Sequence, residues 1–219
     1  RTRKRVANGP AVFSVLRANK KAKEDAIGYV GLALEYFDAV DAMNVGERFT
    51  GPRHLRPMLQ LLGIGLELSL KADLRAQGVS EKDLKDLGHS ITKAYGRVAQ
   101  NMKKSAETKA KCDFIHKVRG FRDAYVKNIG PDAAGASRIP TNEEIGASVP
   151  RSQDMIDRFG KIFASDRGLR YPDTGWDHSA RLSIPPYADI PAFYLSIWGS
   201  AFAVTVDQDV RQWMQSGKE

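Results

Sequence analysis

The sequence predicts an all-α protein, an antiparallel helical bundle that carries an inserted helix and loop region. Apolar residues recur at the helical spacing along most of the chain, and no convincing run has the alternating pattern of a strand. The length of 219 residues fits one domain with a substantial core. We therefore expect a basic segment over residues 1–23 and a single helical domain over 24–219, with the insertion at about 103–165.

Three helical segments are expected before this insertion. Residues 24–44 have one apolar face, which consists of Ile27, Val30, Leu34, Phe37 and Val40. Residues 55–76 are apolar on most sides, which is typical of a helix in the middle of a bundle. Their narrow polar stripe consists of Gln60, Gly63, Glu67 and Lys71. Ser80 with Asp83 forms a capping-box pattern. The apolar stripe that follows consists of Leu84, Leu87, Ile91, Tyr95, Val98 and Met102.

The remainder of the chain alternates helical and irregular patterns. A basic fourth helix is expected to turn Phe114, Val118, Phe121 and Tyr125 inward. Residues 128–153 are rich in Gly, Pro, Ala and Ser and are interpreted as a long loop, and a helix is expected over 152–164. Asp189 is expected to cap a final helix. The inward residues of that helix are Ile190, Tyr194, Ile197, Ala201 and Thr205.

Localisation is inferred from the cysteine content and from hydropathy. A single cysteine, Cys112, excludes an intramolecular disulfide framework and suits a reducing cytoplasm. We identify no export signal. The longest uncharged stretch, residues 190–206, is shorter than the roughly 20 apolar residues of a membrane span and contains polar residues, so it is interpreted as a buried core helix. We expect a cytoplasmic protein without a membrane partner.

The net charge of +8 is unevenly distributed. Residues 1–23 hold eight Lys/Arg and no acidic residue, whereas residues 97–127 hold nine Lys/Arg against three acidic residues. The rest of the chain carries a net charge of −6. Two basic segments on an acidic body indicate a polyanionic partner such as RNA or nucleotide. The alternative is a solvated tail and a solvated helix face.

Two polar features stand out from this background. Glu67 and Lys71 have the spacing of a helix-surface ion pair, but they lie on an otherwise apolar helix, so they must face water, a partner or a pocket. His89 follows Gly88. On an unbroken helix it would lie roughly 140° from Leu84, and after a break at the glycine it would lie in the first turn of a new helix, where anions are favoured. Neither geometry buries it, and a surface or capping histidine is the alternative.

Other candidate residues are weaker. Arg170 and Tyr171 precede Pro172, which biases Tyr171 toward an extended backbone, and a plain loop anchor is the alternative. Cys112 and His116 lie four residues apart, but two ligands do not make a metal site. Asp177 and His178 are interpreted as turn residues. The sequence contains no glycine-rich phosphate loop, Rossmann fingerprint, Gly-x-Ser-x-Gly or His-Glu-x-x-His motif, so no cofactor and no metal are expected.

The stretches "LELSLKADLRAQG", "LGHSI" and "LRYPD" together resemble the HEPN superfamily, the higher-eukaryote and prokaryote nucleotide-binding domains. The matching positions are Glu67, Lys71, Gly78, Gly88-His89 and Arg170-Tyr171-Pro172. Ser90 stands where many members have Asp after the histidine, and residues 103–165 look inserted. The resemblance implies a small helical bundle that associates with RNA or nucleotide and is commonly a homodimer.

This resemblance leads to a hypothesis about the site. His89 and Arg170 would contact phosphate, Lys71 would add charge, Glu67 would orient its neighbours, and Tyr171 would stack on a base or donate a hydrogen bond. Active members of the superfamily are metal-independent nucleases with Arg followed four to six residues later by His, and the one formal match here is Arg48 with His54.

Because Arg48 and His54 lie in a Gly/Pro loop rather than where the catalytic pair is expected, that match is interpreted as coincidence. The leading expectation is therefore an RNA- or nucleotide-binding protein of a toxin–antitoxin or phage-defence type. A metal-independent ribonuclease and a non-catalytic protein-interaction module remain the alternatives.

Overall fold

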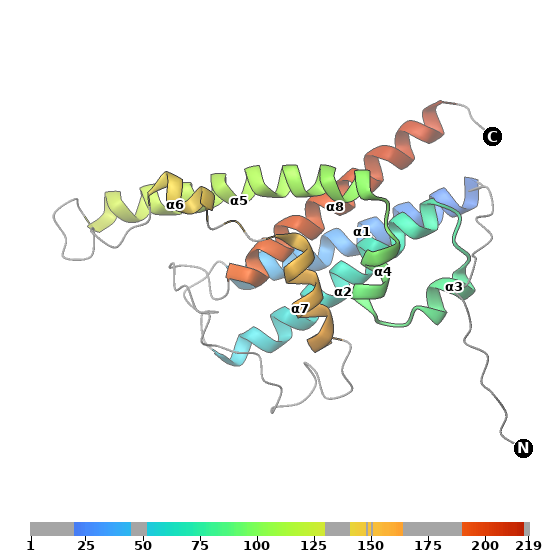
Figure 1. The fold of residues 1–219 in the computed structure, drawn as a ribbon, viewed down its shortest axis with the longest axis horizontal. Helices are drawn as coiled ribbons and strands as arrows, with labels where there is room; N and C mark the ends of the chain where they lie inside the picture. The colour runs from blue at the N-terminus through green and yellow to red at the C-terminus, as the bar shows by residue number, and fades with distance from the viewer. Residues whose placement is uncertain are drawn as a thin grey trace, which may run out of the picture.

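The computed structural model describes residues 20–44, 52–129, 141–147, 149, 151–163 and 190–216. Within these residues the chain forms eight helices and no strand (Figure 1). The prediction of an all-α helical bundle is confirmed. None of the described helices is long and apolar enough to cross a membrane.

Four long helices make up the bundle, and consecutive ones run in opposite directions (Figure 1). They are α1 (Lys20–Asn44), α2 (Pro52–Ala76), α5 (Gln100–Ile129) and α8 (Ile190–Gln215). Four shorter helices complete the described structure: α3 (Glu81–Asp86), α4 (Ile91–Arg97), α6 (Asn142–Ala147) and α7 (Ser152–Phe163). Helix α2 contacts α1, α8, α4, α3 and α7, so it is the central helix that its apolar composition predicts.

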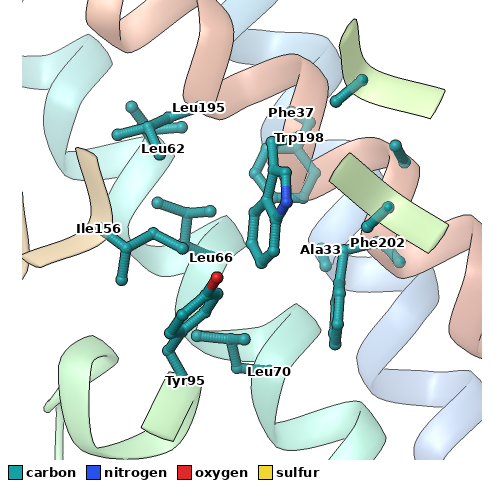
Figure 2. Close-up of a cluster of buried hydrophobic side chains, with 14 of the residues drawn as sticks. Ala33, Phe37, Leu62, Leu66, Leu70, Tyr95, Ile156, Leu195, Trp198 and Phe202 are labelled. Atoms are coloured by element: carbon teal, nitrogen blue, oxygen red, sulfur yellow. The ribbon is translucent and has the colours of Figure 1, made fainter. Parts of the chain in front are cut away.

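The core is densely packed around α2. Leu66 and Leu70 are fully buried on this helix. The Phe37 ring of α1 fits between α2 and α8 at two glycines, because a Cβ atom at Gly65 or at Gly199 would collide with it. Figure 2 shows the adjoining aromatic cluster, in which the ring centroids of Trp198 lie 5.5 Å from those of Tyr95 and 5.2 Å from those of Phe202. The segment 192–199 is buried throughout, as expected for a core helix.

The region expected to be an insertion is partly built into this core. Residues of α5 at every fourth position are buried against the bundle: Met102, Ala106, Ala110, Phe114 and Val118. Ile145, Ile156 and Phe159 belong to the same buried cluster. Only the far end of α5 extends past the bundle, with α6 alongside it (Figure 1). This part of α5 therefore packs against the central bundle.

Two helices begin earlier than the sequence predicts. Helix α1 begins at Lys20, so three lysines of the expected basic segment belong to it, and one of them, Lys23, is buried. Helix α2 begins at Pro52 rather than at residue 55. Proline is favoured at the first helical position because its missing N–H has no intrahelical partner there. His54 thus belongs to a helix, and Arg48 lies outside the described residues.

The stripe from Leu84 to Met102 is buried as predicted, but three helices carry it. Gly88 adopts a φ of +58°, which ends the α3 turn and separates it from α4. Val98 has extended backbone angles and separates α4 from α5. The chain between α5 and α7 also differs from the expected loop, because it contains α6. Thr141 and Glu144 form a capping box at the start of that helix, with two reciprocal hydrogen bonds. The prediction of a loop rests on the Gly, Pro, Ala and Ser content and does not include this short motif.

Candidate functional site

Glu67 lies on α2 at the boundary between the core and the surface. Its side chain is 10% exposed and that of Lys71 is 13% exposed. Lys71 Nζ lies 2.6 Å from Glu67 Oε1, so the two residues form the i,i+4 ion pair that their spacing predicts. The shielding from water distinguishes this pair from ordinary surface pairs, which contribute little to stability.

His89 reaches the same carboxylate from the turn between α3 and α4. Its Nδ1 lies 2.9 Å from Glu67 Oε2, although the two residues are 22 positions apart. The histidine side chain is 72% exposed, so it lies outside the core, as expected. Glu67 thus binds Lys71 through one oxygen and His89 through the other. The structure brings together three of the five residues in the predicted site.

The position of His89 in the chain differs from the expectation. Helix α4 begins at Ile91, and Ser90 is its N-cap, with a side chain that accepts a hydrogen bond from the Lys93 amide. Serine is a preferred N-cap because its oxygen satisfies a free backbone N–H. His89 therefore precedes the helix instead of belonging to its first turn. It follows Gly88, whose φ is positive, and its side chain contacts Glu67 of α2.

The contact with Glu67 defines what the imidazole can do. A carboxylate only accepts hydrogen bonds, so the Nδ1 atom that faces it must carry a proton. The Nε2 atom lies on the other side of this exposed ring. It accepts a hydrogen bond when the ring is neutral and donates one to an anion when the ring is protonated. Carboxylates commonly orient functional histidines in this way.

Arg170, Tyr171 and Pro172, which complete the predicted site, lie outside the described residues. The described part of α7 ends at Phe163, whose ring lies so close to Gly63 that a Cβ atom there would overlap it. Gly63 is one helical turn before Glu67 on α2. The glycine in the predicted polar stripe is therefore explained by packing against α7.

Asp73 is a second buried carboxyl group on α2, and our sequence analysis did not single it out. It is 4% exposed, and its Oδ2 accepts a hydrogen bond of 2.5 Å from Gln77 Nε2. Burial, followed by the charge of Asp209, raises the pKa of Asp73 to about 6, although Gln77, Lys23 and Lys103 act in the opposite direction. The sequence does contain a sign of this burial. On a helical projection Asp73 lies roughly 20° from Leu66, in the middle of the apolar face.

Several basic residues of α5 contact acidic or aromatic side chains. Lys103 Nζ lies 4.3 Å from the centroid of the Tyr95 ring. The ion pairs are Lys111–Glu107 at 3.3 Å, Lys117–Asp41 at 3.1 Å and Arg122–Asp123 at 2.6 Å. Helix α5 is therefore a weaker electrostatic feature than its count of lysines and arginines indicates. Residues 1–19, the other basic segment, lie outside the described ranges.

The remaining candidate residues do not form a site within the described part of the chain. Cys112 is an exposed free cysteine, and His116 is also exposed. No group of three or more potential metal ligands occurs among the described residues. Asp177 and His178 lie outside them.

No protein-family model, curated protein or solved structure matches this chain. The HEPN resemblance therefore remains an expectation from the three sequence motifs.

Proposed function

We propose that this protein is a HEPN-like RNA- or nucleotide-binding protein whose ligand contacts His89 and Lys71, with Glu67 orienting both side chains. The observation that carries the proposal is the hydrogen bond between His89 Nδ1 and Glu67, which joins two elements that are distant in the sequence. An exposed imidazole and a partly shielded ammonium group thus contact the two oxygens of one carboxylate. Such a pair of donors suits a phosphate oxygen.

The proposal includes two residues outside the described ranges. Arg170 would provide a second phosphate contact and Tyr171 a surface for base stacking. Arginine forms bidentate contacts with phosphate, so it would add orientation as well as charge. The superfamily resemblance suggests a homodimer of a toxin–antitoxin or phage-defence type, and the single cysteine suggests the cytoplasm.

Binding of labelled RNA fragments and of nucleotides by the purified protein tests this proposal. His89→Ala should weaken binding roughly tenfold or more, because it removes a hydrogen bond to a charged group. His116→Ala is the matched control, since it removes an exposed histidine from α5. Equal affinities for the wild type and both variants would refute the proposed site. Arg170→Ala should also weaken binding, and the double variant with His89→Ala should lose less than the sum if both residues contact one ligand.

The orientation of His89 favours a second candidate function, a metal-independent ribonuclease. A histidine held by a carboxylate through Nδ1 presents Nε2 for general acid–base catalysis, and an arginine would stabilise the charge of the transition state. Incubation with total RNA in excess EDTA tests this function. Cleavage that His89→Ala abolishes and His116→Ala preserves would support it. Absence of cleavage, or cleavage that survives both His89→Ala and His54→Ala, would exclude it and leave binding as the proposal.

A further inference from the structure

The last turn of α7 lies beside both elements that form the candidate site. Helix α7 contacts α2, which carries Glu67 and Lys71, and α4, which follows His89 (Figure 1). Gly160 packs against α4 so closely that a Cβ atom there would overlap the side chain of Thr92. Thr92 lies only three residues after the histidine. The end of α7 is thus held against the start of α4.

Phe163, the last residue of α7, reaches α2 close to the site. Its ring occupies the space that a side chain at Gly63 would fill. Gly63 and Glu67 are one turn apart on α2, which corresponds to about 6 Å along the helix axis and about 40° around it. The aromatic ring therefore lies about one helical turn from the residue that contacts both His89 and Lys71. This separation is comparable with the one between the phosphate and the base of a single nucleotide.

Phe163 combines a fixed position with partial exposure. Its ring stacks on that of Phe159, with 6.0 Å between the centroids and 17° between the planes. Phe159 is fully buried, whereas Phe163 is only half-buried. Sites for unpaired nucleotides combine an aromatic side chain with nearby cationic groups, because any base can stack on the ring while the cations bind the phosphate. The chain places such a ring beside the His89–Glu67–Lys71 group.

We propose that Phe163 is a base-stacking residue of the candidate site, which takes an unpaired nucleotide with its phosphate at His89 and Lys71. This inference rests on the proposed function and narrows its ligand. A base inside a duplex is already stacked and paired, so it reaches an aromatic side chain only after it is extruded. The ligand is therefore a free nucleotide or single-stranded RNA rather than duplex RNA.

Oligonucleotides distinguish the two sources of an unpaired nucleotide. A single-stranded oligoadenylate that binds the full chain more tightly than AMP would identify RNA as the ligand, and equal affinities would identify the free nucleotide. A duplex of the same length should bind about tenfold more weakly than the single strand at the same salt concentration, because its bases are not available for stacking. Equal or tighter binding of the duplex would overturn the inference.

AMP and ribose 5-phosphate test the role of Phe163, because they share the phosphate and the sugar and differ in the base. The wild type should bind AMP roughly tenfold more tightly than ribose 5-phosphate. Phe163→Leu should remove most of this preference and leave the affinity for ribose 5-phosphate unchanged. Met155→Ala is the control for loosened packing of α7, since it removes a partly buried side chain near the other end of that helix, and it should keep the preference.

The outcomes separate this inference from the proposed function. An unchanged preference in Phe163→Leu would overturn the inference alone, and so would an equal loss of affinity for both ligands, since the ring would then be a packing residue. If the wild type binds neither ligand, or if His89→Ala leaves both affinities unchanged, the site itself is refuted and the inference with it. Nuclear Overhauser effects between the adenine protons of bound AMP and the Phe163 ring provide a measurement on the wild type. Their absence at saturating AMP would overturn the stacking.

Discussion

Glu67 and Asp73 are both shielded carboxyl groups on α2, less than two helical turns apart, yet their surroundings differ. Glu67 contacts an ammonium group and an imidazole, and the imidazole is exposed to solvent. Asp73 accepts a hydrogen bond from the neutral Gln77, and no ion pair with it occurs among the described residues. Burial consequently raises the pKa of Asp73 to about 6.

This difference separates two roles for a buried acid. A carboxylate that has a hydrogen-bond donor on each oxygen can orient a group at the surface, as Glu67 orients His89. A carboxyl group without such a pair is disfavoured in its charged form, and the cost falls on the stability of the fold. The candidate site is thus expected at Glu67, and the pH dependence of folding is expected at Asp73.

The largest expected effect concerns the helix that holds both groups. Leu66→Ala should lower the free energy of unfolding by about 2–5 kcal/mol, through lost burial and a residual cavity. Chemical denaturation measures this loss. Leu32→Ala, at a leucine that is 50% exposed, is the control and should change stability by less than about 0.5 kcal/mol. A loss below about 1 kcal/mol in Leu66→Ala would show that α2 is peripheral and would contradict the central position of both carboxyls.

Asp73→Asn should stabilise the protein near neutral pH. Because the pKa of Asp73 is raised in the folded state to about 6, the folded protein binds this proton more tightly than the unfolded chain. The resulting stabilisation is present below pH 4 and is lost as the pH rises toward and through 6. The asparagine variant keeps a neutral group throughout, so its advantage should grow by up to about 3 kcal/mol between pH 4 and pH 8.

Unfolding curves of both proteins over this pH range provide the measurement. Asp209→Asn, which removes the second cause of the raised pKa, should produce a smaller change of the same sign. A parallel pH dependence in the wild type and Asp73→Asn would show that this carboxyl group ionises in the folded protein as it does in the unfolded chain. In that case Asp73 would not differ from Glu67 as a destabilising buried carboxyl group.

The sequence predicts the bundle well because burial follows the helical period. Leu84, Leu87 and Ile91 are buried as their spacing indicates, although Gly88 interrupts the helix between them. The period reports which side of the chain is apolar, whereas a local turn depends on φ angles that composition does not specify. For a similar reason α6 is not predicted. The glycines, prolines and alanines around Thr141 indicate a loop, although Thr141 and Glu144 form a capping box.

The candidate site is only partly predictable. The Glu67–Lys71 pair follows from spacing on one helix, but the 2.9 Å contact of His89 with Glu67 depends on how two elements pack. The HEPN resemblance places these residues in one site, whereas the helical periodicity alone does not predict their contact. Asp73 is absent from the predicted polar stripe because it projects onto the apolar face of the helix, and the same projection marks it as buried.

A smaller effect is expected at Glu67. Glu67→Gln keeps the shape of the side chain but removes its charge, so it should lower stability by about 1–2 kcal/mol, because Lys71 loses its partner in a shielded position. Glu24→Gln, at an exposed position on α1, is the matched control and should be nearly neutral. Thermal unfolding at neutral pH distinguishes them. Equal melting temperatures for the two variants would mean that Glu67 behaves as a solvated surface residue.

The smallest effect on stability, and the largest on binding, is expected at His89. His89→Ala should change the free energy of unfolding by less than about 0.5 kcal/mol, because the side chain is 72% exposed. Differential scanning calorimetry measures this change. An unfolded variant would instead make His89 a structural cap of the α3–α4 turn, and its separation from the core would be lost.

The most direct test follows the histidine side chains by nitrogen-15 NMR while a short RNA or a nucleotide is added. His116 provides an internal control, because it is exposed on α5 and distant in sequence from the candidate site. The proposed site predicts a saturable shift of the His89 Nε2 resonance at ligand concentrations that leave His116 unchanged. Identical small shifts at both histidines, or a shift at His116 alone, would contradict a ligand-binding role for the pair that His89 forms with Glu67.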